Sequence, residues 1–395
     1  MWNLFYLNAI DHGSLLLRGL CRKCINFATC SNISKSLVTR TRCSSKPPWR
    51  VLFFGSDDFA VESLKQLYAS REDRGDAVVD SLEVVTLSSN VPVRKFADRH
   101  KLRAHDWPNV DFSGCFDVGV VVSFGCLLQE SIINKFPYGI LNVHPSLLPR
   151  WRGPAPVFHT VLHGDKITGV TIMQIRPTRF DVGPILSREL YQVPEKCTAD
   201  QLGAYLAVLG AELLIDTLRN LPERIANRKE QAKEGATFVL HIRRYNIGCA
   251  SAPKISTSMS WLVWEEQTCD QISQLFRAIG FRIPLRTIWM DRTVKLQDFV
   301  GKCKMPFTEN SYAVVPGSIH YDKESNTILV CCKDGWVGFK TITLKKRLSA
   351  ADFFNGYLHQ DRQKNSTQNN YRFQSYRPHF AKGQNAKLLS LNSCD

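Results

Sequence analysis

The chain has 395 residues, 44% of them hydrophobic and 22% charged, which is the composition of an ordinary soluble protein long enough for two folded domains and tails. Its formal net charge of +15 suits a polyanionic partner, because Lys and Arg release condensed counterions when they neutralise phosphates. The longest apolar run, near 118–128, is too short to span a bilayer, so we expect no transmembrane helix and no membrane partner.

The first 48 residues are rich in Arg, Lys, Ser and Thr, and Asp11 is their only acid. With apolar patches such as 10–20, this composition is typical of a mitochondrial transit peptide. We therefore expect the protein in the mitochondrial matrix. The alternative is a basic arm that is simply disordered.

Residues 49–222 predict alternating strands and helices. The run 50–55 is an apolar strand that ends in glycine, and Ser56 or Asp57 is placed to cap a helix to about Tyr68. A short helix is predicted at 94–100, and further strands at 82–87, 117–122, 139–143, 168–175 and 186–193. Thr198 caps a long helix with one apolar face, made of Leu202, Tyr205, Leu206, Leu209 and Leu213.

This alternation predicts an α/β domain with a Rossmann-like, largely parallel sheet. In such sheets the ligand crevice lies beyond the carboxyl ends of the strands. The pattern changes near residue 222, and the charged start of 223–260 predicts a linker.

Residues 261–358 predict a smaller β domain. A helix at 270–279 precedes a turn at Pro316-Gly317 and a hairpin of 328–332 and 336–344, with Asp334-Gly335 at its turn. Short strands at this spacing predict a β-barrel of the OB type. Residues 359–395 are polar and basic, and we expect a disordered tail.

The 13 cysteines show no disulfide framework and no zinc-like spacing. Cys21 and Cys24 form an isolated pair in the leader, whereas the adjacent Cys331 and Cys332 suit a reduced, buried strand. We therefore expect a reducing compartment and no metal.

The segment from Leu141 to Gly153 carries the chemistry. Strand alternation places Asn142 and His144 on one face of the chain. Acyl transfer to an amine needs an amide N–H for the oxyanion and a base that takes the proton of the attacking nitrogen. A carboxylate would orient the imidazole. Asp181, which Gly183 and Pro184 keep in a loop, is the first candidate; Asp165, in a sequence typical of a surface turn, is the alternative.

The run Asn142-x-His144-Pro-Ser-Leu-Leu-Pro149, followed 32 residues later by Asp181-x-Gly183, resembles the 10-formyltetrahydrofolate-dependent formyltransferases. Segments 55–60, 150–156 and 168–174 resemble the branch of that family that acts on methionyl-tRNA, and the resemblance covers 50–357. It implies transfer of a formyl group from 10-formyltetrahydrofolate to the α-amino group of initiator methionyl-tRNA, for mitochondrial translation initiation. The family needs no metal, and we expect a monomer.

By this resemblance, Asn142, His144 and Asp181 are the catalytic group. The folate would bind to two segments: Ser146, Leu147, Leu148 and Pro149, and Phe124, Gly125, Cys126, Leu127 and Leu128. Without the motif, an isolated Asn-x-His is more often structural, and 124–128 has the pattern of a core segment. For tRNA binding the candidates are basic, and each is as consistent with a solvated surface charge: Arg150, Arg152, Lys345, Lys346 and Arg347.

Three departures from the family concern the substrate rather than the catalytic group. The loop 87–93 is short where bacterial relatives carry a long basic loop that engages the tRNA, 239–251 has the character of an insertion, and the leader and tail match poorly.

Two other functions fit part of the pattern. One is a sibling enzyme with a small amine as acceptor, against which the second domain and the net charge argue. The other is a basic RNA-binding protein with an inactive α/β domain, against which the complete catalytic group argues.

Overall fold

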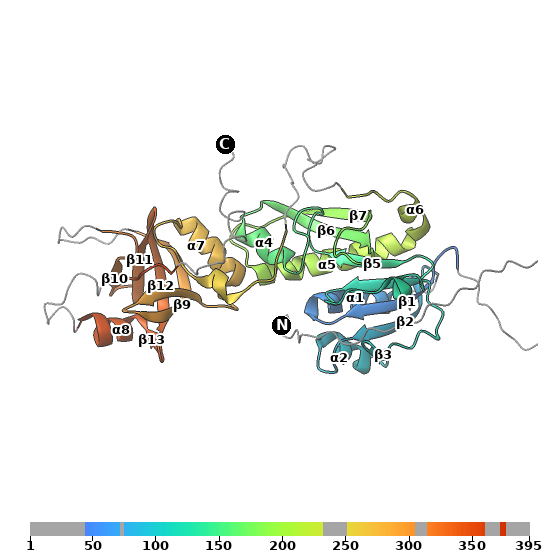
Figure 1. The fold of residues 1–395 in the computed structure, drawn as a ribbon, viewed down its shortest axis with the longest axis horizontal. Coiled ribbons are helices and arrows are strands. Elements are labelled where there is room, and N and C mark those ends of the chain that lie inside the picture. The colour runs from blue at the N-terminus through green and yellow to red at the C-terminus, as the bar shows by residue number, and fades with distance from the viewer. Residues whose placement is uncertain (1–43, 72–74, 232–250, 305–313, 360–371, 377–395) are drawn as a thin grey trace, which may run out of the picture.

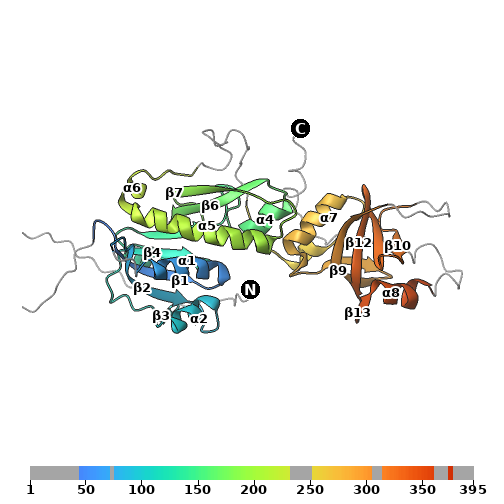
Figure 2. The ribbon, with the colours of Figure 1, turned by 180° about the vertical axis from the view of Figure 1, so that it is seen from behind.

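The computed structural model describes residues 44–71, 75–231, 251–304, 314–359 and 372–376. Figures 1 and 2 show two parts along the long axis of the molecule, each built on its own sheet. The leader up to residue 43, most of the predicted insertion and most of the tail lie outside the described residues.

The first part is built on a seven-stranded sheet of order β3-β2-β1-β4-β5-β6-β7. The first five strands in this order, β3, β2, β1, β4 and β5, are parallel to one another. At the other edge β6 runs antiparallel to β5, and β7 runs antiparallel to β6. The prediction of a largely parallel sheet is therefore confirmed. The strands are β1 (Trp49–Gly55), β2 (Val79–Thr86), β3 (Arg103–Asp106), β4 (Val118–Val122), β5 (Ile140–His144), β6 (Ile167–Gln174) and β7 (Ile185–Gln192).

The helices of this part are α1 (Asp58–Ala69), α2 (Pro92–Arg99), α3 (Glu130–Ile133), α4 (Pro156–Leu162), α5 (Ala199–Arg219) and α6 (Leu221–Ala226). Asp57, not Ser56, caps α1, because its Oδ1 accepts the amide of Ala60 at 3.0 Å. Thr198 caps α5 through a capping box, as expected. The sequence did not predict β3, α3 or α4, which are too short to show a hydrophobic period.

The long helix α5 packs against α1 and β6, and the predicted face is confirmed except for Tyr205. Leu202 and Leu206 are buried and Leu209 and Leu213 are partly buried against the core, whereas Tyr205 is 53% exposed. The buried face also includes Ala207, Gly210, Ala211, Leu214 and Leu218. Contrary to our first expectation, α5 is long and apolar enough to cross a membrane by length and composition. The core helix of a soluble protein passes the same test, and 44% of the apolar window of α5 is buried inside the protein.

The two faces of the sheet have different neighbours. Val143 of β5 faces α5, where a Cβ on Gly210 would come within 2.8 Å of it. Leu52, Phe54 and Ile140 face the other way and form a second core cluster. Side chains alternate along a strand, so Asn142 and His144 share the face of Ile140, opposite α5.

The second part contains α7 (Cys269–Leu275), which continues as a wider turn to Gly280, and six strands. They are β8 (Leu285–Trp289), β9 (Arg292–Cys303), β10 (Ile319–Asp322), β11 (Thr327–Cys332), β12 (Gly335–Thr343) and β13 (Arg347–Ser349), followed by α8 (Ala350–Phe353). Their order is β10-β11-β12-β9-β8, all antiparallel, with β13 beside β12. This architecture is consistent with the predicted small barrel-like domain.

The predicted hairpin of β11 and β12 is present with a different turn. Cys332 pairs with Gly335, so the two loop residues are Lys333 and Asp334 rather than Asp334 and Gly335. Cys331 and Cys332 are buried free thiols, as expected for a reduced strand.

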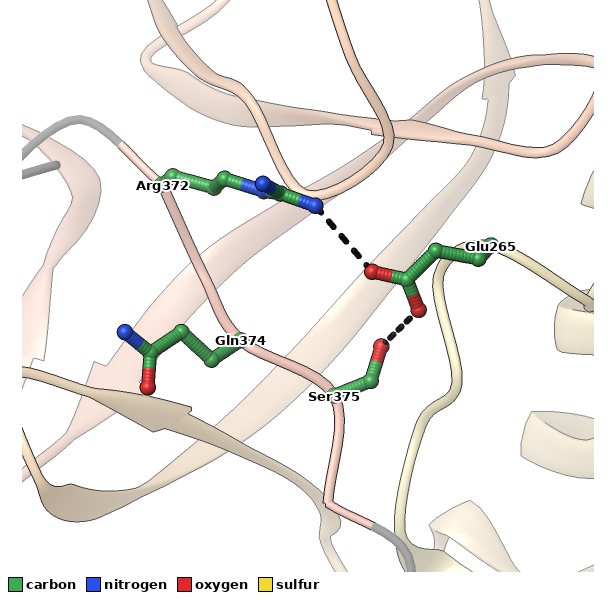
Figure 3. A pocket seen from close by; sticks show the side chains of 4 residues that line it. All are labelled: Glu265, Arg372, Gln374 and Ser375. Atoms are coloured by element: carbon green, nitrogen blue, oxygen red, sulfur yellow. Dashed lines mark hydrogen bonds and ion pairs between the residues drawn. The ribbon is translucent and has the colours of Figure 1, made fainter. Parts of the chain in front are cut away.

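The prediction of a structureless tail is wrong for residues 372–376. This strap runs beside β8, where Ile288 and Gln374 exchange backbone hydrogen bonds of 3.1 and 2.7 Å. Figure 3 shows Arg372 and Ser375 of the strap converging on Glu265; the Arg372–Glu265 ion pair measures 3.1 Å. Phe373 between them is fully buried. Phe373, an apolar side chain in a polar segment, anchors the strap. The composition averaged over the whole tail does not reveal the effect of a single residue.

The two parts touch along α4, which packs against α7 in Figure 1. The chain enters the second part beside the 152–155 loop, where Arg152 and Ala252 are joined by a backbone hydrogen bond of 2.7 Å. His159 of α4 donates from Nε2 to the Pro253 carbonyl at 2.9 Å. The entry into the second part is thus fixed to the loop that follows β5.

Candidate active site

Strand β5 supplies two of the three predicted catalytic side chains. Asn142 and His144 project from the same face, and His144 is only 5% exposed. Beyond His144 the chain turns into the loop 145–155, so both side chains lie at the carboxyl end of a central strand. In an open α/β sheet this is where ligands bind.

Asp181 meets both of these side chains. Its Oδ1 accepts an N–H of Asn142 at 3.1 Å and lies 3.6 Å from Nδ1 of His144. Its Oδ2 accepts the backbone N–H of Gly153 at 2.9 Å. Three groups that lie up to 39 residues apart in the sequence therefore converge on one point.

The hydrogen bond on the far side of the imidazole defines which nitrogen is basic. Nε2 of His144 lies 3.0 Å from the backbone carbonyl of Trp151. A carbonyl oxygen only accepts, so Nε2 must carry a proton. In the neutral ring the lone pair is then on Nδ1, which faces Asp181. A proton gained by His144 would therefore appear at Nδ1, on the side of the ring that faces Asp181.

Asn142 keeps one donor for a substrate. Its amide has two N–H groups, of which one bonds Asp181. The second has no acceptor among the described residues. An amide held by a carboxylate and left with one N–H is suited to stabilise an oxyanion that forms beside it.

The backbone around Asp181 is held by residues that the sequence did not point to. Asp181 itself has a left-handed φ of 55°, and a Cβ on Gly183 would meet the Gln174 carbonyl at 1.7 Å. Nε2 of Gln231 donates to the carbonyls of Asp181 and Gly183 at 3.0 and 2.8 Å, and its Oε1 accepts from Arg152. Gln231 lies in the interval predicted as a linker, which therefore contributes to the site.

Asp165, the alternative carboxylate, faces away from the imidazole and holds the loop instead. It binds the guanidinium of Arg150 through two hydrogen bonds of 2.8 and 2.7 Å and accepts Nε1–H of Trp151 at 2.7 Å. Arg150 also stacks on the Trp151 ring, 4.3 Å from its centroid. The carbonyl that binds His144 belongs to this same Trp151. Asp165 therefore affects the imidazole indirectly, by holding Trp151.

Asp165→Asn is expected to lower turnover about 10- to 100-fold, because the amide keeps only one acceptor oxygen and no charge for Arg150, so the loop loosens and the Trp151 carbonyl that orients His144 moves by a fraction of an ångström or more. The KM values for both substrates should change little. Asp216→Asn, which breaks a surface ion pair of 2.8 Å with Arg224, is the matched control and should leave kcat unchanged. An unchanged kcat for Asp165→Asn would show that the loop holds Trp151 without this carboxylate.

The four residues after Pro145 build the loop from its interior. Ser146 donates to the Arg150 carbonyl at 2.7 Å, and Thr171 links the Ser146 carbonyl to the Leu148 amide. The side chains of Ser146, Leu147, Leu148 and Pro149 are all buried. The structure thus gives them a packing role, and contact with folate remains a prediction.

The segment after β4 is divided between core and surface. Phe124 and Leu128 are 2% exposed and belong to the second core cluster. Gly125, with a φ of 82°, is exposed, Cys126 is partly buried, and Leu127 is 41% exposed. An exposed loop backbone with one exposed leucine, at the carboxyl end of the strand beside β5, fits an aromatic ligand with polar edges.

Asp57 is a buried carboxylate at the neighbouring strand end that the sequence marked only as a cap. It is 7% exposed and hydrogen-bonds Ser123 as well as the Ala60 amide. Burial raises the pKa of Asp57 to about 6, although both hydrogen bonds oppose the shift. This carboxylate therefore costs stability at neutral pH.

Asp57→Asn is expected to stabilise the protein more at pH 8 than at pH 5. The folded-state pKa is raised, so the stabilising contribution is complete below pH 4 and is lost as the pH rises through 6. Asparagine caps equally well and does not ionise. The gain in unfolding free energy should grow by about 1–2 kcal/mol between pH 5 and pH 8, measured with urea. A gain that does not change between pH 5 and pH 8 would contradict the raised pKa of Asp57.

The residues predicted to bind tRNA have different surroundings. Arg150 is paired with Asp165, and Arg152 with Gln231. Lys345, Lys346 and Arg347 are exposed in the turn between β12 and β13, where Arg347 lies 3.0 Å from Asp298. All five remain predictions as tRNA contacts.

Sequence comparisons agree with this geometry. The family model described as formyl transferase matches residues 51–218, and the one described as formyl transferase, C-terminal domain, matches 254–358. The chain is 52% identical to mitochondrial methionyl-tRNA formyltransferase of Homo sapiens and 51% identical to that of Bos taurus. These alignments cover 90% and 89% of the chain and 90% and 88% of the relatives.

A bacterial relative is more distant but nearly complete. Methionyl-tRNA formyltransferase of Roseobacter denitrificans is 32% identical, over 79% of this chain and 97% of its own length. Both domain models and identities of this size over most of the sequence show that the chain belongs to the formyl transferase family, among the methionyl-tRNA formyltransferases.

Proposed function

We propose that the protein transfers the formyl group of 10-formyltetrahydrofolate to the α-amino group of initiator methionyl-tRNA, and so makes formylmethionyl-tRNA for translation initiation in mitochondria. The observation that carries the proposal is the convergence of Asn142, His144 and Asp181, within 3.1 and 3.6 Å, at the carboxyl end of β5. The names of the relatives support the choice of substrates.

In the proposed reaction the amine nitrogen attacks the formyl carbon, and the formyl oxygen becomes an oxyanion. The second N–H of Asn142 donates to this oxyanion. Nδ1 of His144 takes the proton that the nitrogen must lose, and Asp181 stabilises the imidazolium. The bond between the carbon and N10 of the folate then breaks, and the proton moves to N10. Charges and protons balance without a metal.

The donor is proposed to bind across the strand ends on one side of the catalytic group. The exposed backbone of 125–127 would hold the pterin, with Phe124 and Leu128 beneath it and Ser146, Leu147, Leu148 and Pro149 beside it. Strand β4 is the neighbour of β5, so a ligand there reaches Asn142 and His144 directly.

The remaining regions are proposed to bind the tRNA and to target the protein to the mitochondrion. Residues 49–222 would form the catalytic domain, 223–260 the connection and 261–358 the tRNA-binding domain. Arg150, Arg152, Lys345, Lys346 and Arg347 would contact RNA phosphates. Residues 1–48 would direct a monomeric protein to the mitochondrial matrix, away from membranes.

A formylation assay separates this proposal from its alternatives. Purified protein with 10-formyltetrahydrofolate should formylate methionyl-tRNA, with a KM that rises steeply with salt. Formylation of a small sugar amine or nucleotide amine instead would indicate a sibling enzyme. No transfer, combined with RNA binding and no folate binding by calorimetry, would indicate an inactive RNA-binding protein.

A further inference from the structure

We infer that Phe180 is the binding site for the terminal base of the acceptor strand, which stacks on its ring while the attached amino acid reaches His144. The inference rests on the proposed function and adds one contact to it. Phe180 directly precedes Asp181, yet its side chain is 57% exposed. Nothing in the described part of the chain stacks on this ring. A large aromatic group left in water beside a catalytic carboxylate has no role in folding.

The backbone of the loop that carries Phe180 is held by hydrogen bonds, although its tip is exposed. Thr178 and Asp181 both have left-handed φ angles, of 70° and 55°. Gln231 binds the carbonyls of Asp181 and Gly183 from one side, and Arg176 forms an ion pair of 2.6 Å with Glu230. A fixed backbone that presents an uncovered ring provides a stacking platform without an ordering cost on binding.

The loop of Phe180 and the proposed donor segment lie on opposite flanks of β5. The proposed donor segment follows β4, on one flank of β5, whereas the Phe180 loop joins β6 and β7 on the other flank. With the formyl donor on the first flank, the amine must arrive from the second. The same flank is tied to the second part of the molecule, because Gly153 bonds Asp181 and packs against Ala252 at the domain connection.

The exposure of Phe180 favours the terminal base, rather than the methionyl side chain, as the group that contacts its ring. A thioether is expected in a closed apolar pocket, whereas a base at the end of an RNA strand needs only one flat partner and stays partly in water. Arg179 is exposed next to Phe180 and is placed for the phosphate of the same nucleotide.

The test is the affinity of the variant Phe180→Ala for each substrate. The KM for methionyl-tRNA, and the Kd measured without formyl donor, should rise roughly 5- to 150-fold, which corresponds to loss of one base–aromatic stack. The KM for 10-formyltetrahydrofolate should stay unchanged. Phe180→Tyr should restore wild-type affinity, because it keeps the ring.

Tyr205→Ala is the matched control, since Tyr205 is 53% exposed but lies on α5, behind the sheet. Its affinities should equal those of the wild type. An inactive wild type would refute the proposed function. An active wild type with unchanged tRNA affinity in Phe180→Ala, or with a raised KM for the formyl donor instead, would overturn the stacking site alone.

Discussion

Replacing His144 with alanine should lower kcat for formyl transfer by about 10²- to 10⁴-fold, the usual contribution of a positioned general base. Nδ1 of this ring is the proposed acceptor for the proton of the attacking amine, and the alanine variant keeps the Asn142–Asp181 hydrogen bond of 3.1 Å but has no imidazole. The Kd for methionyl-tRNA should change less than twofold, since the ring is 5% exposed and offers the tRNA almost no surface.

Two comparisons make this result specific to the imidazole. Asn142→Ala should lower kcat by about 10²- to 10³-fold through loss of an oxyanion donor. His100→Ala, at the C-terminal end of α2 where the ring packs against Tyr68 and Phe96, should leave both kcat and Kd unchanged. If His144→Ala retained more than a tenth of wild-type kcat, another group would have to take the proton, and the assignment of Nδ1 would be wrong.

The convergence at this site was predictable in part from residues alone. Alternation along β5 places Asn142 and His144 on one face wherever that strand lies. Asp181 is different, because its contact with His144 spans 37 positions that include an antiparallel strand. The residues left Asp165 as an alternative to Asp181 and favoured Asp181 only because the sequence around Asp165 is typical of a surface turn; the family motif supported the same choice. The structure separates them: Asp165 binds Arg150 and Trp151.

The supports of the site could not have been predicted. The Trp151 carbonyl and the Gly153 amide are backbone groups, which every residue possesses, and Gln231 comes from a stretch without pattern. Strand β3 was not predicted for a similar reason, because only one of its four residues is buried and its sequence shows no hydrophobic pattern. For α5 the predicted face was right except for Tyr205, which was placed in the core but is 53% exposed.

The strap of residues 372–376 was likewise not predictable from the composition of the tail. It carries the substitution for which we expect the largest loss of stability. Phe373→Ala should lower the free energy of unfolding of the second domain by about 3–5 kcal/mol. The ring is fully buried, with its centroid 6.3 Å from that of Trp264 and 6.2 Å from that of Phe353. The surrounding side chains belong to a sheet and a helix that cannot close the cavity.

Urea denaturation of the full chain measures this loss, and Tyr376→Ala in the same strap is the comparison. Tyr376 is 41% exposed, so its removal should cost about 1 kcal/mol or less. Equal, small effects of both variants would mean that the strap leaves β8 in solution and that the barrel is complete at Leu358. A large effect of Phe373→Ala alone means that the strap is an edge of the domain, held by the buried ring of Phe373 as well as by the backbone hydrogen bonds between Gln374 and Ile288.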